Sequence, residues 1–216
     1  MQIKKINSWG NFSNNFSLEY KFKNLFELKK HLKKKKKYTV SGNYRSYGDS
    51  CLNKNILNTR NFSKIIFFDK KKGILRAQSG VTLKKILELI VPHGWFLMVT
   101  PGTKYVTLGG AISSDIHGKN HHRIGCFSEC VINFKLMKPN GKTIDCSKKN
   151  NKEYFRAVCG GMGLIGVVTE ASIKLLKIKS TKIEQDVYIA ENLEKTFEYF
   201  EKYKKYNYSS AWVDTI

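Results

Sequence analysis

The chain has 216 residues, of which 41% are apolar and 12% aromatic, and its formal net charge is +22. This length allows one large or two small domains with a buried core, and no apolar run reaches the roughly 18 residues that a membrane-spanning helix requires. The first residues lack the apolar segment of a secretory signal, so we expect a cytoplasmic protein.

The positive charge comes mainly from lysine, because only five of the 39 basic residues are arginine. Arginine is the better ligand for phosphates and guanine edges, which disfavours a nucleic-acid binder without removing it as an alternative. The densest basic run covers residues 29–38. It is either a solvated helix end or a patch that binds an anionic membrane surface or another polyanion.

In the first half of the chain, periodicity and turn residues predict two helices and three strands. Leucines at 25, 28 and 32 indicate the first helix. The clearest helix spans residues 82–94, where Thr82 can cap the start and Gly94 can end it. The predicted strands cover residues 38–42, 64–69 and 74–80.

In the second half, Pro139-Asn140-Gly141 is a strong turn signal and predicts a hairpin over residues 130–146. Two further helices are predicted over residues 151–160 and 193–203. Two further strands are predicted over residues 166–178 and 208–216. Short helices among many strands, without regular βαβ repetition, indicate the α+β class.

Five cysteines are present, and none of them forms a C-x-x-C pair; they are Cys51, Cys126, Cys130, Cys146 and Cys159. This pattern indicates reduced thiols and disfavours a structural zinc site.

The first of three glycine-containing segments is SGNYRSYGDS, residues 41–50, which follows a predicted strand. Gly42 and Gly48 allow positive φ, so tight turns could point backbone amides into an anion-binding concavity. Ser46 could add a hydroxyl donor and Arg45 a charge. The alternative is an ordinary turn between a strand and a loop.

The second segment is PGTKYVTLGGAISSDIHGKNHH, residues 101–122. Its paired glycines would let a ligand approach the backbone, and its threonine and serines supply hydroxyls. His117 and His121 are four residues apart, as in zinc-binding helices, but Gly118 lies between them and the glutamate of an H-E-x-x-H motif is missing. We therefore expect no metal site here. Either a single positioned histidine acts on the ligand, or the histidines are structural.

The third segment, GGMGLIG at residues 160–166, matches G-x-G-x-x-G. A helix is predicted before it and a strand after it, the reverse of the order in a Rossmann nicotinamide site, which we therefore reject. Two anion-binding loops, a glycine-lined wall and a histidine predict a long ligand with a diphosphate centre and flat ends. FAD suits this description better than ATP, because no G-x-x-x-x-G-K-[ST] motif is present.

Four motifs occur in a familiar order: RSYGD, TPGT, VTLGGAISSDIHGKNHH and GGMGLIGVV. Together they resemble the FAD-binding domain of the vanillyl-alcohol oxidase superfamily. Within that superfamily, DIHGKNHH followed by G-x-F is most similar to the branch of decaprenylphosphoryl-β-D-ribose oxidases.

The resemblance implies a two-lobed, PCMH-type FAD-binding domain over residues 1–180, with lobes of about 1–73 and 74–180. Residues 181–216 would begin a substrate-binding cap domain that is incomplete in this chain. Relatives with covalently bound flavin carry a histidine directly before the serine of the first loop. Arg45 occupies that position here, so the resemblance implies non-covalent FAD.

The resemblance also implies which residues form the site. His117 and Lys119 would be catalytic. The implied FAD-binding residues are Tyr44, Arg45, Ser46, Tyr47, Gly48, Asp49, Gly102, Thr103, Thr107, Leu108, Gly109, Gly110, Ser114, Asp115, Ile116, His117, Gly118, Gly161, Gly166 and Val168.

The implied activity is oxidation of a secondary alcohol of a sugar by hydride transfer to flavin N5. The substrate would be a polyprenyl-phosphate-linked pentose used in cell wall biosynthesis. The alternatives are an aldonolactone or alditol oxidase of the same superfamily and a non-catalytic flavin-binding fragment without its cap. Expected partners are a membrane surface and a reductase or epimerase, and no nucleic acid.

Overall fold

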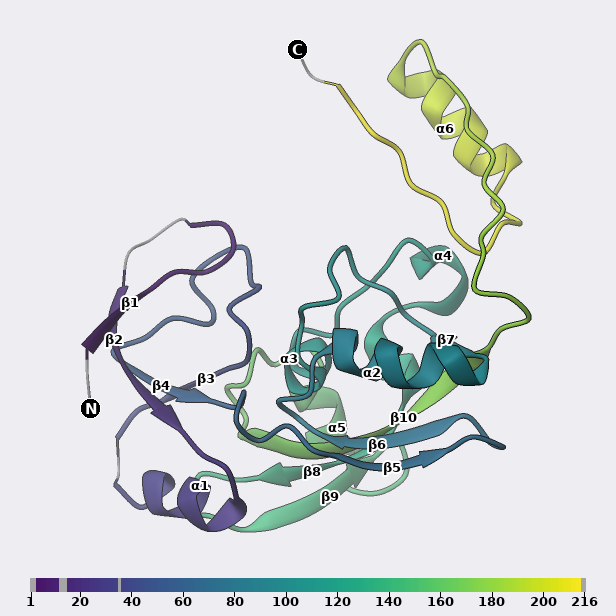
Figure 1. Ribbon diagram of the computed structural model, residues 1–216. Helices are drawn as coiled ribbons and strands as arrows, with labels where there is room; N and C mark the ends of the chain where they lie inside the picture. Colours follow the sequence, from purple (N-terminus) through teal and green to yellow (C-terminus); the bar gives the residue numbers. More distant parts are fainter. Residues whose placement is uncertain (1–2, 12–14, 35, 215–216) are drawn as a thin grey trace.

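The computed structural model describes residues 3–11, 15–34 and 36–214 and contains two β-sheets (Figure 1). The first sheet has the strand order β1-β2-β4-β3, with β1 at Ile3–Ile6, β2 at Asn15–Lys21, β4 at Asn55–Asn58 and β3 at Thr39–Ser41. β1 is antiparallel to β2, whereas β4 runs parallel to both β2 and β3. Parallel pairing requires a crossover, and α1 (Leu25–Leu32) lies in the connection from β2 to β3. This sheet and α1 form the first lobe.

The second sheet has six strands, all paired antiparallel. Five follow the order β5-β6-β10-β8-β9, at Ile65–Asp69, Ile74–Gln78, Val167–Lys177, Val131–Met137 and Thr143–Ser147, and β7 (Trp95–Leu97) pairs with the end of β10. The central strand β10 is the last strand in the described part of the chain, so this sheet is complete only when residue 177 is in place.

Three helices cover one face of the second sheet: α2 (Leu83–Ile90), α3 (Leu108–Ser113) and α5 (Lys152–Val158). Their buried side chains pack against alternate residues of the central strands, including Phe134 on β8 and Ile173 on β10. The sheet and these helices form the second lobe. Its shorter helical segments are η1 (Val91–His93), α4 (His121–Ile124) and η2 (Phe127–Cys130).

A smaller core joins the two lobes. Tyr20, Phe22 and Leu28 of the first lobe are buried together with Met137 and Val167 of the second. The chain passes from the first sheet to the second between residues 58 and 65, earlier than residue 73, where the resemblance places the lobe boundary. The two lobes therefore have separate sheets but a common apolar contact.

The strongest local signals are confirmed. Thr82 caps α2 by accepting a hydrogen bond from the Lys85 amide, and Gly94 ends the helical segment with a left-handed φ of 74°. The predicted hairpin is present as β8 and β9, with Gly141 at a φ of 78° in its turn. Strands β1, β2, β4 and β7 and helices α3 and α4 were not predicted. In the described part of the chain, no helix is both long and apolar enough to cross a bilayer.

Residues 179–214 form an arm that extends from the end of β10 and carries α6 (Leu193–Lys202), as Figure 1 shows. The helix predicted here is confirmed, but its apolar side chains are not buried: Leu193 and Phe197 are each 61% exposed. The strand predicted over 208–216 is wrong for residues 208–214, which have no regular structure, and residues 215–216 lie outside the described residues. A strand needs a paired neighbour, and none of the described strand pairings involves this segment.

Candidate cofactor-binding site

A cleft of about 380 Å³ lies between the two lobes. One wall is the loop that follows β3, between residues 40 and 51, and the other is formed by residues 106–116 around α3. Thr59, Ser79 and the segment around Gly163 complete the lining. Because these segments are distant in sequence, the cleft requires both lobes to be folded.

The structure brings only part of the predicted FAD-binding set to this cleft. Its lining includes Tyr44, Arg45, Ser46, Tyr47, Gly48, Thr107, Gly109, Gly110, Ser114, Ile116 and Val168. Outside the lining lie Asp49, Gly102, Thr103, Leu108, Asp115, His117, Gly118, Lys119, Gly161 and Gly166. The lining residues that the predicted set leaves out are Val40, Ser41, Gly42, Asn43, Ser50, Cys51, Thr59, Ser79, Val106, Ser113, Met162 and Gly163.

The loop after β3 turns at Tyr44, whose backbone is left-handed with a φ of 54°. We expected Gly42 and Gly48 to provide this conformation, but neither is among the residues with positive φ. A tyrosine adopts it at a cost. Here the Tyr44 hydroxyl donates to Oε1 of Glu19 at 2.8 Å and accepts from Nδ2 of Asn58 at 2.9 Å. Burial raises the pKa of this hydroxyl, so Tyr44 remains a neutral donor that holds the loop against the first sheet.

The two predicted anion-binding loops touch each other. A Cβ atom at Gly42 would lie 2.2 Å from Oγ1 of Thr107, so only glycine allows this approach. Nδ2 of Asn43 donates to the carbonyl oxygen of Tyr105 at 2.9 Å, and the Arg45 guanidinium lies 5.6 Å from the Tyr105 ring centre. The loops therefore form one continuous surface across the lobes.

Local hydrogen bonds fix the backbone of the second loop at the cleft. Thr107 caps α3, because its Oγ1 accepts a hydrogen bond from the Gly110 amide at 3.2 Å. The amide of Gly109 donates to the carbonyl oxygen of Ser79 at 2.8 Å. The Leu108 side chain is fully buried in the core of the second lobe, which explains why Leu108 does not line the cleft although it was predicted to bind FAD.

Asp115 and the residues directly after Ile116 do not line the cleft. The Asp115 carboxylate accepts hydrogen bonds from the Ser128 amide at 2.7 Å and from its hydroxyl at 3.0 Å, so it fixes the loop instead of facing the cleft. His117 is exposed, and its ring contacts that of His121 edge-on with 5.7 Å between centres. His117 therefore follows directly after the last lining residue of this wall.

The glycines of the third segment have different roles. The segment lies between α5 and β10, in the order that excluded a Rossmann site. Met162 and Gly163 line the cleft. Gly161 and Gly166 instead allow close backbone packing, because a Cβ atom there would lie 2.1 Å from the Ala157 oxygen or 2.8 Å from the Met137 oxygen.

The arm contacts the histidine segment. The Ser209 amide donates to the Lys119 carbonyl oxygen at 2.9 Å, and Nε2 of His122 donates to the Tyr206 carbonyl oxygen at 3.0 Å. The arm thus contacts Lys119, two residues after His117.

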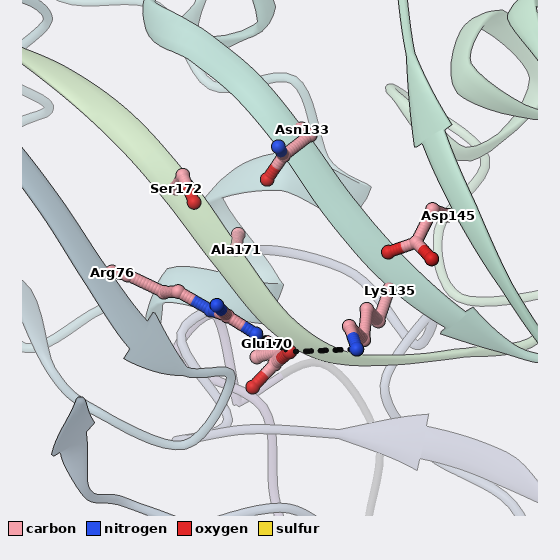
Figure 2. Close-up of a pocket in the computed structure, with 7 residues that line it drawn as sticks. All are labelled: Arg76, Asn133, Lys135, Asp145, Glu170, Ala171 and Ser172. Carbon is pink, nitrogen blue, oxygen red and sulfur yellow. Dashed lines mark hydrogen bonds and ion pairs between the residues drawn. The ribbon is translucent and has the colours of Figure 1, made fainter. Parts of the chain in front are cut away.

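A second hollow of about 260 Å³ lies on the face of the second sheet that the helices leave uncovered (Figure 2). Figure 2 shows Arg76 and Lys135 on either side of Glu170; both are ion-paired with it, the lysine at 3.5 Å. The Asp145 carboxylate also lines this hollow. Its cations are already balanced by carboxylates, so it is a poorer anion site than the cleft.

The cysteines offer no activated nucleophile. All five are free thiols. Burial raises the pKa of Cys130 and of Cys159 to about 12 and that of Cys146 to about 11, so each is a protonated thiol at neutral pH. In the described residues, no three histidine, cysteine or acidic side chains gather as candidate metal ligands.

The described lining of the cleft fits a long ligand with a diphosphate centre. It contains Arg45 and no carboxylate, together with hydroxyls and the backbone of both glycine-containing loops. Val106, Ile116 and Val168 provide apolar surface for a flat ring system. Ser79 contributes a fully buried hydroxyl without a hydrogen-bond partner among the described residues, as expected where a ligand supplies the partner.

Residues 27–147, more than half of the chain, match the family of FAD binding domains. Decaprenylphosphoryl-beta-D-ribose oxidase of Mycolicibacterium smegmatis is 33% identical over 177 residues, which cover 80% of this chain and 38% of that protein. The mitochondrial L-galactono-1,4-lactone dehydrogenase of Brassica oleracea is 28% identical over 147 residues (68% of this chain, 24% of that protein), and human Delta(24)-sterol reductase is 29% identical over 119 residues (55% and 23%). The chain spans less than half the length of each of these relatives. It belongs to the FAD-binding domain family of the vanillyl-alcohol oxidase superfamily, and its cofactor is FAD.

Proposed function

We propose that this chain is the FAD-binding part of an oxidoreductase that oxidises a secondary alcohol of a sugar, with a polyprenyl-phosphate-linked pentose as the favoured substrate. The observation that carries the proposal is the position of His117. This exposed imidazole directly follows Ile116, the last residue of the cleft wall around α3, and so adjoins the cofactor site. The similarity to a decaprenylphosphoryl-beta-D-ribose oxidase favours the substrate.

In this proposal the chain binds the cofactor and handles one proton. Bound FAD supplies the hydride acceptor. The loops on either side of Gly42 and Thr107 hold the cofactor non-covalently, and Arg45 supplies positive charge beside the diphosphate. His117 orients the substrate hydroxyl or takes its proton, and the Lys119 side chain, also exposed, adds positive charge next to that position.

We further propose that the arm belongs to the half of the enzyme that binds the substrate. It contacts Lys119 and His122 through backbone atoms, next to the proposed catalytic histidine. Its exposed apolar side chains include Trp212, at 94% exposure, and Ile189, at 89%. Such a surface is typical of a segment that packs against further polypeptide.

Two other functions remain as alternatives. An aldonolactone or alditol oxidase is favoured by the similarity to L-galactono-1,4-lactone dehydrogenase. A non-catalytic flavin-binding module is the second alternative, because it requires only the cleft between the lobes.

Anaerobic titration of the FAD-loaded chain separates the three functions. We expect a polyprenyl-phosphate pentose to bleach the yellow flavin absorbance, and aldonolactones and alditols to leave it unchanged. Bleaching by a lactone or an alditol alone would show that the protein is instead an aldonolactone or alditol oxidase. A yellow protein that no sugar bleaches would support the binding module.

We also propose that the lysine-rich helix contacts an anionic bilayer. Phe26, Lys29, Lys30 and Lys33 share one face of α1 and its end, and Phe26 is 77% exposed. In the described part of the chain, none of these three lysines forms an ion pair with a carboxylate. In Figure 1, α1 lies at the opposite side of the molecule from α4.

A further inference from the structure

Ser79 has a hydroxyl for which the described residues provide no partner. The residue follows β6 directly, is 0% exposed, and its Oγ atom makes no hydrogen bond within the described residues. Ser79 nevertheless lines the cleft between the lobes. Buried hydroxyls in folded proteins are nearly always hydrogen-bonded, so an unpaired one at the wall of a cofactor cleft indicates that the cofactor completes it.

The backbone at Ser79 is fixed by two neighbouring elements of the second lobe. The Ser79 amide donates to the Thr169 carbonyl oxygen at 2.9 Å, and its own carbonyl oxygen accepts from the Gly109 amide at 2.8 Å. The next residue is equally confined, because a Cβ atom at Gly80 would lie 1.9 Å from the Thr59 oxygen. The backbone of Ser79 is thus held between β10, α3 and the end of β4, at the wall of the cleft.

The position of Ser79 indicates which part of FAD it contacts. Its bonded neighbour Gly109 lies two residues after Thr107, the residue that meets Gly42 of the first loop. Ser79 therefore adjoins the place where the two loops converge, and the described lining there is rich in backbone and hydroxyl groups and free of carboxylates. We propose that the Ser79 hydroxyl donates a hydrogen bond to a diphosphate oxygen of FAD. This inference rests on FAD as the cofactor and not on the proposed sugar oxidation.

Binding measurements on the FAD-free chain test the proposal. We expect Ser79→Ala to weaken the binding of FAD and of ADP by about tenfold or more, because a hydrogen bond to a charged group is lost. Riboflavin, which has no diphosphate, should bind both forms equally. Ser172→Ala is the matched control, since Ser172 also lies in the second sheet but lines the outer hollow in Figure 2.

Thermal unfolding without FAD distinguishes a cofactor contact from a structural role. If the hydroxyl only stabilised the fold, Ser79→Ala would lower the melting temperature of the FAD-free chain. Removing an unpaired buried hydroxyl should leave the melting temperature of Ser79→Ala equal to or above that of the unaltered chain. The rise in melting temperature on adding FAD should be smaller in the variant. Ser79→Cys, which keeps the size and weakens the donor, should fall between the two.

Three results would overturn the proposal: FAD affinity of Ser79→Ala within twofold of the unaltered chain, an equal loss for riboflavin, or a lower melting temperature or failure to fold of FAD-free Ser79→Ala. If instead the Ser79 effect is present and no sugar bleaches the flavin, only the proposed sugar oxidation fails. The two failures are therefore distinguishable.

Discussion

The Tyr44 hydroxyl lies 2.8 Å from Oε1 of Glu19 and so ties the left-handed turn of the first cofactor loop to β2. Nδ2 of Asn58 on β4 donates to the same oxygen of Glu19 at 2.7 Å. The Glu19 side chain is 9% exposed, and its second oxygen lies 3.5 Å from Nζ of Lys21. This network connects the loop to two strands of the first sheet.

We expect Tyr44→Phe to lower the free energy of unfolding by about 1–3 kcal/mol, because a largely buried carboxylate loses a donor. Urea denaturation measures this loss, and FAD affinity should fall with it as the loop loses its anchor. Glu19→Gln should reduce the effect of the tyrosine change in a double-mutant cycle. Tyr154→Phe is the control, because that ring is 37% exposed. Equal stability of Tyr44→Phe and the unaltered chain would contradict the anchoring role.

Gly42→Ala should separate the two loops. The added Cβ atom would lie 2.2 Å from Oγ1 of Thr107, so the backbone on one side must shift. We expect a loss of about 1–3 kcal/mol in stability and a marked loss of FAD binding. Gly102→Ala serves as the stability control, because an added Cβ atom there meets no atom within 4 Å. Normal FAD binding by Gly42→Ala would show that the loops need not touch.

His117→Gln should retain the cofactor and lose the reaction. FAD affinity should change little, because His117 lies outside the cleft lining. Anaerobic bleaching by a substrate sugar should slow by about 10²–10⁴-fold, the usual contribution of a positioned acid or base. His122→Gln is the neighbouring control, since that ring bonds to the Tyr206 carbonyl oxygen of the arm. An unchanged bleaching rate in His117→Gln would remove the proposed role.

Mild acid should destabilise the domain through His31. Burial lowers the pKa of this imidazole below its ordinary value of 6.5, and the nearby charge of Lys34 acts in the same direction. The unfolded chain then binds the proton more readily than the folded one, so the free energy of unfolding should fall as the pH drops through 6.5.

Urea denaturation at neutral and at mildly acidic pH measures this effect. His31→Gln should flatten the pH dependence, whereas the same change at His121, which is exposed, should not. If His31→Gln leaves the slope of stability against pH unchanged, another group causes it.

The lysine-rich helix can be tested with vesicles. Charge reversal at Lys29, Lys30 and Lys33 should weaken binding to vesicles rich in anionic lipid by more than about 100-fold, at about 1 kcal/mol per lysine. Phe26→Ser should weaken it further if the ring enters the interface. Binding that does not depend on anionic lipid would count against the bilayer contact, and tighter binding to a nucleic acid would favour the polyanion alternative.

The sequence predicts elements whose signals are local. The Thr82 cap, the apolar face of α2 and the Pro139–Gly141 turn each lie within a few residues of the structure they determine. Strands β1 and β7 are too short, at 4 and 3 residues, for alternation to be recognised. Strand β2 depends on a parallel partner more than 30 residues away, so its pairing cannot be inferred from its own residues.

The same distinction holds in the cleft. The two cleft loops could be predicted from their glycines, because glycine lets another chain segment approach the backbone closely, as Thr107 approaches Gly42. The left-handed turn at Tyr44 could not be predicted, because the groups that stabilise it are Glu19 and Asn58, from separate strands. Thr59 and Ser79 were missed for a similar reason: strand ends from different lobes meet there.

The apolar contact between the lobes limits how the cleft can move. To swing apart, the lobes would have to expose Phe22 and Leu28 on one side and Met137 and Val167 on the other to water. Complete burial of each such side chain is worth roughly 1.5–3 kcal/mol, so wide opening would be rare at equilibrium. We therefore expect the cofactor to enter a cleft of fixed width. Its association rate should depend on the residues at the opening of the cleft more than on a hinge motion between the lobes.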